Sequence, residues 1–309
     1  MNQSVSVIIP TYNGIKYIKQ AIDSAIAQTL PALEIIVVDD GSTDGTEEII
    51  LSYGNQVKYI PQKNKRTAGA YNTGVFAAKG KYIAFLEHDD VWSPEKNSEQ
   101  VKFLENNKEF GMVYSTVELL FEGTASKQAD IHFQDTEGEY NFADFFTRNR
   151  VLNCSSVMLR KEVLDNIGGF REDLALAFDY DLWLRIANKY KIFCQEALYT
   201  QYRIHSNNLS KDDDELKAAE GSLATILYWK NNAVAQQRVG IKLFRDRLAK
   251  LHKRVAWDYS LIDQRDKELS HLWQAVKNQP LDLNHWKLFF WHSLNRKLRS
   301  RLTWYTRKF

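Results

Sequence analysis

The sequence of 309 residues contains few cysteines. Cys154 and Cys194 stand far apart, and no C-x-x-C pair occurs. Neither a disulfide framework nor a thiolate metal site is therefore supported, and a reducing compartment fits this usage. The chain also lacks a basic leader followed by an apolar segment, and no apolar run approaches about 18 residues. These absences predict a cytoplasmic protein that is neither exported nor membrane-spanning.

Two glycine-rich nucleotide motifs are missing as well. No G-x-G-x-x-G follows the first strand-like run, and no G-x-x-x-x-G-K-S/T occurs. The first absence argues against dinucleotide-dependent redox chemistry, and the second argues against P-loop hydrolysis. Hydrophobic residues make up 44% of the chain and charged residues 26%, which excludes a disordered or collagen-like chain.

Short β-branched runs alternate with helical periodicity in the first part of the chain. The strand-like runs are Val5–Ile9, Glu34–Asp39, Val57–Ile60 and Lys81–Leu86. Strands that alternate with helices in this way predict a parallel sheet covered on both faces, with the ligand at the carboxyl ends of the strands. The segments expected at those ends are Pro10–Asn13, Asp39–Ser42 and Glu87–Asp90.

The pattern changes further along the chain. From about Ser93 to Arg203 strand-like and helical segments are mixed, and beyond Ser210 the sequence is nearly all helical. We therefore expect an α/β fold with a Rossmann-like, mostly parallel sheet flanked by helices and followed by an α-helical C-terminal extension. The predicted division is a first domain at 1–209, with halves of about 1–92 and 93–209, and the extension at 210–309.

Acidic groups crowd the end of the fourth predicted strand. Phe85-Leu86 runs directly into Glu87-His88-Asp89-Asp90, which places three acids at one strand end. Such charges repel, and Mg²⁺ or Mn²⁺ makes the arrangement tolerable when one or two carboxylates and substrate phosphates bind it. The alternative is that the acids cap the next helix, which starts near Pro94, because acids favour helix N-termini.

Two more strand ends carry polar or aromatic groups suited to a nucleotide. Asp39-Asp40-Gly41-Ser42 can offer a carboxylate to a base or ribose. A simple turn explains Gly41 and Ser42 but leaves the two adjacent acids unexplained. Tyr12 stands before an Asn-Gly turn signal and is placed to stack on a planar ring.

Taken together, these segments resemble glycosyltransferase family 2, whose members have the GT-A fold. The resemblance covers roughly residues 4–205 and depends on several motifs in the right order. The motifs are S-V-I-I-P-T-Y-N at 6–13, V-V-D-D-G-S-T-D at 37–44, F-L-E-H-D-D at 85–90, G-G-F at 168–170 and D-Y-D-L-W-L-R at 179–185. The first domain would then be the catalytic domain, with a nucleotide-sugar half and an acceptor half.

The resemblance implies a set of nucleotide-binding residues: Pro10, Thr11, Tyr12, Asn13, Asp40, Arg66, Glu87 and His88. Pro10, Tyr12 and Asp40 correspond to base and ribose contacts, and Arg66 to the basic residue that meets the nucleotide or its diphosphate. The D-x-D element of the family falls on Glu87-His88-Asp89. Glu87 replaces the usual Asp there and is expected to accept a hydrogen bond from a ribose hydroxyl.

The metal ligands and the catalytic base are also implied by the resemblance. Asp89 matches the usual metal ligand and His205 the downstream metal-binding His, so Mn²⁺ or Mg²⁺ is expected. The family's acidic pair reads Phe178-Asp179 here, which assigns the base to Asp179. Asp181 and Trp183 share the predicted helix with Asp179 and are expected to contact the acceptor. The alternative for Trp183 is a core position that anchors the helix.

The implied reaction is an inverting, metal-dependent transfer of one sugar from a nucleoside diphosphate sugar, UDP-linked by default. The acceptor would be a hydroxyl of a glycan or a lipid-linked molecule in cell-surface polysaccharide or glycoconjugate assembly. One candidate base fits a single displacement, and the absence of Q-x-x-R-W indicates a non-processive enzyme.

The departures at Glu87 and Phe178 keep open a catalytically silent nucleotide-sugar-binding or scaffold protein. A sugar-1-phosphate nucleotidyltransferase would need a Gly-rich, Arg-bearing loop after the first strand, and Asn13–Lys16 is not one.

The net charge of +2 hides an asymmetry. From Trp286 to Phe309 there are seven Lys or Arg and no acid, whereas the rest of the chain carries 34 basic and 39 acidic residues. Basic residues interleaved with bulky apolar ones predict peripheral contact with an anionic membrane, on its cytoplasmic face. The alternative is a helix docked on the catalytic domain with its basic face in water. The negative balance of the body disfavours nucleic acid.

Overall fold

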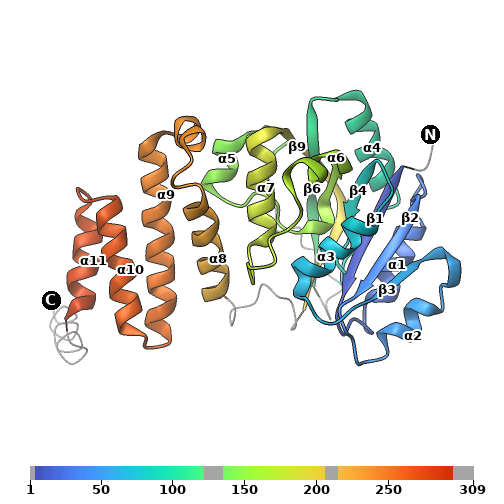
Figure 1. Cartoon of the computed structure of the whole chain (residues 1–309), viewed down its shortest axis with the longest axis horizontal. Coiled ribbons are helices and arrows are strands. Elements are labelled where there is room, and N and C mark those ends of the chain that lie inside the picture. Colours follow the sequence, from blue (N-terminus) through green and yellow to red (C-terminus); the bar gives the residue numbers. More distant parts are fainter. Residues whose placement is uncertain (1–3, 122–134, 206–214, 295–309) are drawn as a thin grey trace. The chain divides into compact units, whose positions relative to one another are not determined.

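The computed structural model describes residues 4–121, 135–205 and 215–294. The chain divides into two compact units, Met1–Asn208 and Leu209–Phe309 (Figure 1). The first unit contains a β-sheet with helices, and the second is helical. Both cysteines are buried and carry free thiols, so the described residues hold no disulfide.

Within the described part of the first unit, nine strands form one sheet in the order β3-β2-β1-β4-β8-β6-β9-β5, with β7 beside β9. The strands are β1 Val5–Thr11, β2 Glu34–Asp39, β3 Lys58–Pro61, β4 Tyr82–Phe85, β5 Val91–Trp92, β6 Phe110–Phe121, β7 Gly138–Tyr140, β8 Val157–Arg160 and β9 Lys191–Ile204. Strands β3, β2, β1 and β4 are parallel to their neighbours. Strands β6 and β9 are also parallel, whereas β8, β5 and β7 pair antiparallel. The expected α/β fold is confirmed.

Helices follow the strands of the first unit. They are α1 Ile18–Ile26, α2 Thr46–Leu51, α3 Arg66–Ala77, α4 Lys96–Asn106, α5 Phe142–Thr147, α6 Lys161–Ile167 and α7 Phe178–Lys189. Helix α1 buries Ile18, Ala21, Ile22 and Ala25 in the core, which is the spacing that places side chains on one helical face. Every residue of β1 is buried.

The parallel arrangement fixes where the functional segments lie. Because β1, β2 and β4 run in the same direction, their carboxyl ends meet at one edge of the sheet. The loops that follow these strands begin at Tyr12, Asp40 and Leu86, respectively. The three strand-end segments that the sequence singles out therefore lie on the same edge.

The second unit is built from α8 Glu215–Tyr228, α9 Ala233–Leu261, α10 Arg265–Asn278 and α11 Leu283–Ser293. Short connections join successive helices, and Gly240 breaks the helical geometry of α9 with a φ of 77°. Among the described residues of the chain, every helix falls short of the length and apolar character that a membrane crossing requires. Residues 295–309, which carry six of the seven basic residues of the tail, lie outside the described ranges.

Helix α3 approaches β1 closely at a glycine, which yields a test of the packing. A Cβ atom built on Gly74 would overlap Cγ2 of Ile8 in the middle of β1. We expect Gly74→Ala to lower the free energy of unfolding of the first unit by about 1–3 kcal/mol, although alanine is the better helix former. Urea unfolding followed by circular dichroism measures the change. Phe76→Ala, on an exposed position of the same helix, is the control, and a Gly74→Ala variant as stable as the parent would contradict the packing.

Candidate active site

The loops after β1 and β2 are tied together by Asn13. Its backbone N–H donates to Ser42 Oγ at 2.9 Å, and its Oδ1 accepts from the backbone N–H of Thr43 at 2.9 Å. Asn13 has a φ of 51°, a left-handed conformation that Asn tolerates better than most residues. The side chain of Tyr12 is 51% exposed. The planar ring of a ligand can therefore contact Tyr12 next to the loops that follow β1 and β2.

The two acids at the end of β2 have different surroundings. Asp39 accepts from the backbone N–H of Ser42 at 2.8 Å and from the hydroxyl of Tyr59 at 3.3 Å, so it closes the turn. Asp40 accepts at Oδ1 from Gln62 Nε2 at 2.6 Å and from the backbone N–H of Lys65 at 2.8 Å. These two bonds connect Asp40 to the segment that starts α3.

Arg66 is the first residue of α3 and follows directly on the residue that binds Asp40. Its side chain is exposed, and its φ of 64° lies in the left-handed region. A non-glycine residue in this conformation is uncommon and carries backbone strain. The start of α3 thus places an exposed guanidinium on the residue that follows the backbone N–H bound to Asp40.

Three carboxylates meet after β4. Ligand oxygens of Glu87, Asp89 and Asp90 lie within 4.8 Å of one another. Asp90 is fully buried, and its Oδ2 accepts from Asn153 Nδ2 at 2.7 Å and from Ser155 Oγ at 2.5 Å. Its Oδ1 accepts from the backbone N–H of Arg203 at 3.0 Å. Asp90 is therefore a fixed anchor of the cluster.

Asp89 faces a histidine from the far end of β9. The Nε2 atom of His205 lies 3.0 Å from Asp89 Oδ2, and the ring of His205 packs on Tyr17 with centroids 4.9 Å apart. The side chain of Arg203 donates from Nε to the carbonyl of Asp89 at 2.8 Å. Strand β9 thus fixes both the backbone and the side chain of Asp89.

Burial makes this cluster electrostatically costly. Desolvation raises the pKa of Glu87 well above its ordinary value, and repulsion from Asp90, Asp89 and Asp179 adds to the effect. Desolvation and the neighbouring Asp89 raise the pKa of Asp90 to about 8, although three hydrogen bonds act in the opposite direction. A divalent cation among these oxygens would relieve the repulsion and favour the ionised forms.

The residues present fit such a cation. Two ligands of an octahedral ion with bonds of about 2.1 Å are separated by about 3 Å when they are adjacent. The oxygen of Asp89 and the nitrogen of His205 lie at that separation. Carboxylates suit Mg²⁺ and Mn²⁺, and a site with few protein ligands leaves positions for substrate phosphates.

Helix α7 carries Asp179 in its first turn. The residue before the helix, Ala177, has a φ of 61° and redirects the chain into α7. Asn149 donates from Nδ2 to Asp179 Oδ2 at 3.1 Å. Burial raises the pKa of Asp179, while hydrogen bonds from the backbone of Tyr180 and from Asn149 lower it. Asp179 also contributes to the raised pKa of Glu87, so the charges of the two carboxylates interact.

Of the other residues that the sequence assigned to the nucleotide, two face inward. Thr11 is buried, and its Oγ1 has no hydrogen-bond partner. Desolvation lowers the pKa of His88, against a hydrogen bond to the carbonyl of Pro10 that raises it. His88 and Thr11 also border the position where a Cβ on Gly14 would sit. Thr11, His88 and Gly14 thus form a close-packed floor behind the exposed Tyr12.

The expected acceptor contacts of Asp181 and Trp183 are not supported. Asp181 is fully buried and accepts from Arg185 Nε at 2.7 Å, and the same guanidinium donates to the carbonyl of Gly169 at 2.7 Å. Trp183 has no exposed surface and packs edge-on against Phe170. Both side chains anchor α7, which for Trp183 is the second of the two roles considered from the sequence.

Sequence reasoning missed the residues that hold the carboxylates in place. These are Asn149, Asn153, Ser155 and Arg203. The only signals were a run of small polar residues at 153–156, just before β8, and an arginine two positions before His205. Without the fold, neither signal shows which carboxylate these residues bind.

Comparison with known proteins places this chain in a family. The model described as Glycosyl transferase family 2 matches residues 6–168. An uncharacterized glycosyltransferase of Rickettsia prowazekii is 37% identical over 205 residues, which are 65% of this chain and 64% of that protein. The chain thus spans less than two thirds of that relative. The Escherichia coli UDP-Glc:alpha-D-GlcNAc-diphosphoundecaprenol beta-1,3-glucosyltransferase WfaP is 35% identical over 216 residues, covering 67% of this chain and 79% of that protein.

Solved structures share the fold at lower identity. S. aureus TarS 1-349 in complex with UDP has a TM-score of 0.66 and 20% identity, over 90% of this chain and 81% of that one. The mannosyltransferase PcManGT from Pyrobaculum calidifontis in complex with GDP-Man and Mn²⁺ has a TM-score of 0.61 and 18% identity, over 97% of this chain and 83% of that one. With its GT-A-like fold, its ordered motifs and a family model that matches more than half of its length, the chain belongs to glycosyl transferase family 2.

Proposed function

We propose that this chain transfers one sugar from a UDP-sugar to a hydroxyl of a glycan or lipid-linked acceptor, with inversion at the anomeric carbon. The observation that carries the proposal is the position of Asp179. Helix α7 brings its carboxylate close enough to Glu87 to raise the pKa of that group by repulsion, and Glu87 lies in one cluster with Asp89. The charge of the candidate base on α7 therefore acts on the acidic cluster that follows β4.

On the donor side, two exposed side chains, Tyr12 and Arg66, and the buried carboxylate of Asp40 suit a nucleoside diphosphate. The ring of Tyr12 offers a stacking surface for the base. Asp40 lies at the end of the neighbouring strand as a hydrogen-bond acceptor for the base or the ribose. The guanidinium of Arg66 is exposed at the start of α3 and suits the diphosphate.

The candidate cation site would stabilise the leaving diphosphate. Asp89 and His205 would hold Mn²⁺ or Mg²⁺, which when bound acts as a Lewis acid for the charge that develops on the diphosphate. Asp90 keeps the strand end rigid through its bonds to Asn153 and Ser155. Glu87 remains available to accept from a ribose hydroxyl.

On the acceptor side, Asp179 is the general base. Asn149 donates to its Oδ2 and orients the carboxylate, which takes the proton of the acceptor hydroxyl. A positioned base of this kind contributes typically about 10²–10⁴-fold to a rate. One base and one displacement invert the anomeric centre, whereas retention by a covalent intermediate requires a second carboxylate that acts as nucleophile.

The substrate classes are supported by the relatives. The E. coli relative is named for transfer from UDP-Glc to a diphosphoundecaprenol-linked sugar, and S. aureus TarS binds UDP. For this chain we therefore propose a UDP-sugar as donor and a lipid-linked sugar or glycan as acceptor, within cell-surface polysaccharide or glycoconjugate assembly.

Replacement of the base tests the proposal. Asp179→Asn keeps the shape of the side chain and removes its basicity, so we expect kcat to fall by about 10²–10⁴-fold with little change in the affinity for the donor. A panel of UDP-sugars with Mn²⁺, read as released UDP, selects the donor, and calorimetry measures its affinity. Asp173→Asn, in the exposed segment before α7, is the matched control. Full activity of Asp179→Asn, or donor binding without turnover in the parent, would contradict the proposed role.

The cation site has its own test. Asp89→Asn removes the charge of the proposed ligand, and we expect the enhancement of UDP binding by Mn²⁺ to fall by at least about tenfold. Calorimetric titration of UDP with and without Mn²⁺ measures this enhancement. The exposed Asp165 on α6 supplies the control variant Asp165→Asn. If Asp89→Asn kept the full enhancement, the assigned ligand would be wrong.

The pH dependence follows from the surroundings of Asp179. The base works only when ionised, and burial raises its pKa above that of a free Asp carboxyl, so activity falls as the pH drops through this raised value. Asn149→Ala removes a hydrogen bond that favours the ionised form, and we expect the acidic limb of the kcat profile to move to higher pH. Asn166→Ala, on the surface of α6, should leave the profile unchanged. Superimposable profiles for Asn149→Ala and the parent would exclude this role of Asn149.

A further inference from the structure

Helix α11 presents apolar side chains on two opposite sides. Its inner side packs within the second unit: His285 is buried, and His292 contacts Glu268 of α10 through a short hydrogen bond. Phe289 packs on Trp273 of α10 with ring centroids 5.4 Å apart. These contacts, together with the edge of the Trp286 ring on Trp273, pack α11 against α10.

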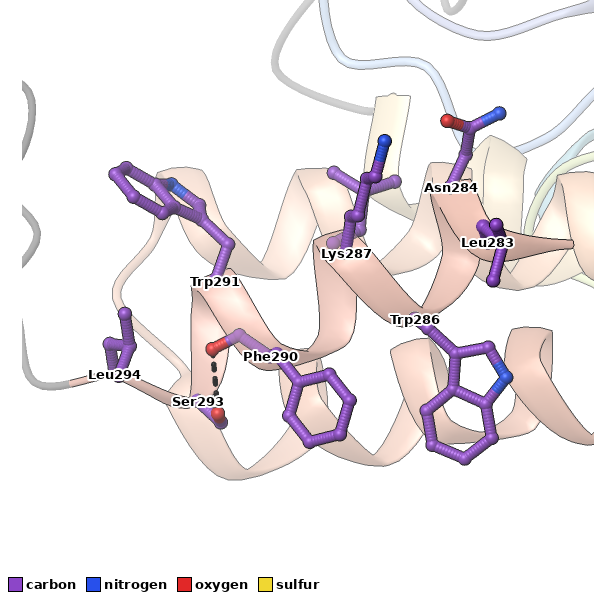
Figure 2. A pocket seen from close by; sticks show the side chains of 9 residues that line it. Leu283, Asn284, Trp286, Lys287, Phe290, Trp291, Ser293 and Leu294 are labelled. Carbon is purple, nitrogen blue, oxygen red and sulfur yellow. Dashed lines mark hydrogen bonds between the residues drawn. The ribbon is translucent and has the colours of Figure 1, made fainter. Parts of the chain in front are cut away.

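The outer side carries a second stripe. We define the outer stripe as Leu283, Trp286, Lys287, Phe290, Trp291 and Leu294, which recur at the i, i+3, i+4, i+7, i+8 and i+11 spacing of one helical face. Five of the six residues are apolar, and all six line an open hollow of about 910 Å³. Figure 2 shows Trp286 and Phe290 on one flank of the helix and Lys287 and Trp291 on the other.

Described residues cover the outer stripe only in part: Leu283, Lys287 and Phe290 are exposed, whereas Trp286, which packs on Trp273 of α10 with ring centroids 5.8 Å apart, is half-buried, as are Trp291 and Leu294. Leu283 is 70% exposed and Phe290 is 57% exposed. The rings of Trp286 and Phe290 stack on each other with centroids 5.6 Å apart, so they form one continuous apolar surface. A helix that is apolar on both sides is normally covered on both sides, and an exposed patch of this kind marks an interaction site.

Charge selects the kind of partner. After residue 208 the chain has 20 basic and 11 acidic residues, a net charge of +9, whereas residues 1–208 have 21 basic and 28 acidic residues, a net charge of −7. Two copies joined through the outer stripe would bring two units of +9 together, and such like-charge contacts are unfavourable. An anionic surface is complementary to this unit.

Side-chain chemistry points to a lipid surface. Tryptophan has a large apolar ring with a polar N–H and favours the boundary between water and hydrocarbon. At a membrane surface, lysine buries its apolar stem and keeps its ammonium group among lipid headgroups. Lys287 lies between Trp286 and Trp291 on the outer stripe and is suited to this arrangement. Apolar burial combined with attraction to anionic lipids is the mode by which amphipathic helices bind at an interface.

We propose that the outer stripe of α11 docks this protein on an anionic lipid bilayer. The stripe lies flat in the headgroup region, with Leu283, Phe290 and the two tryptophans in contact with acyl chains. The basic residues of the second unit add attraction that salt weakens. The proposal depends on the surface of this unit and not on the catalytic proposal above.

Vesicle co-sedimentation of the full chain tests this docking. We expect binding to vesicles of phosphatidylcholine with phosphatidylglycerol, and weaker binding in high salt or to phosphatidylcholine alone. The double variant Leu283→Ser, Phe290→Ser should lose about tenfold or more in partition onto the anionic vesicles. Phe76→Ser, which changes a 93% exposed aromatic residue of the first unit, is the matched control and should bind like the parent.

The outcomes separate docking from folding and from catalysis. Circular dichroism and UDP release in solution should be the same for the double variant and the parent, and Phe290→Leu should retain vesicle binding. The proposal is overturned if the parent does not sediment with anionic vesicles or if the double variant binds as well as the parent. It is also overturned if sedimentation velocity shows a parent dimer that the double variant dissociates, because the stripe would then be an interface between two copies.

Discussion

Carboxylates of like charge repel one another when they are removed from water, and the first unit holds four of them together: Glu87, Asp89, Asp90 and Asp179. The cost is visible in the raised pKa values of Glu87 and Asp90. It is partly offset by hydrogen bonds, since Asp90 receives three and Asp179 receives one from Asn149. This concentration of negative charge after β4 and at the start of α7 favours the binding of a cation and the uptake of a proton.

The topology of the sheet is what brings these groups together. Strand β8 runs antiparallel beside β4, so the short turn Cys154–Ser156 that precedes β8 lies under the strand end that carries Glu87. Strand β9 is long enough to deliver Arg203 and His205 to Asp89 and Asp90 from more than a hundred residues away in the sequence. The mixed half of the sheet, through β8 and β9, therefore holds the acidic groups that follow the parallel strand β4.

The parallel half could be read from the sequence because its signals are local. Short apolar runs followed by polar strand ends placed Tyr12, Asp40 and Glu87 at one edge, and the structure agrees. Strand β9 was not foreseen, because its burial is irregular and polar residues interrupt it. The expected acceptor contacts of Asp181 and Trp183 are not supported for a related reason. Helical spacing shows which residues share a face, but it does not show which of them are buried in the core. Asp179 is half-buried in the first turn of α7, whereas Trp183, one turn further along the helix, has no exposed surface.

The central claim is that the acidic strand end binds a divalent cation together with a nucleoside diphosphate. Anomalous diffraction at the manganese edge, from crystals grown with UDP and Mn²⁺, tests it most directly. The account predicts one manganese peak within bonding distance of Asp89 Oδ2 and His205 Nε2, with the diphosphate on the ion and Asp179 facing the space beyond it. A manganese peak elsewhere, with UDP bound and no metal at Asp89, would contradict the account.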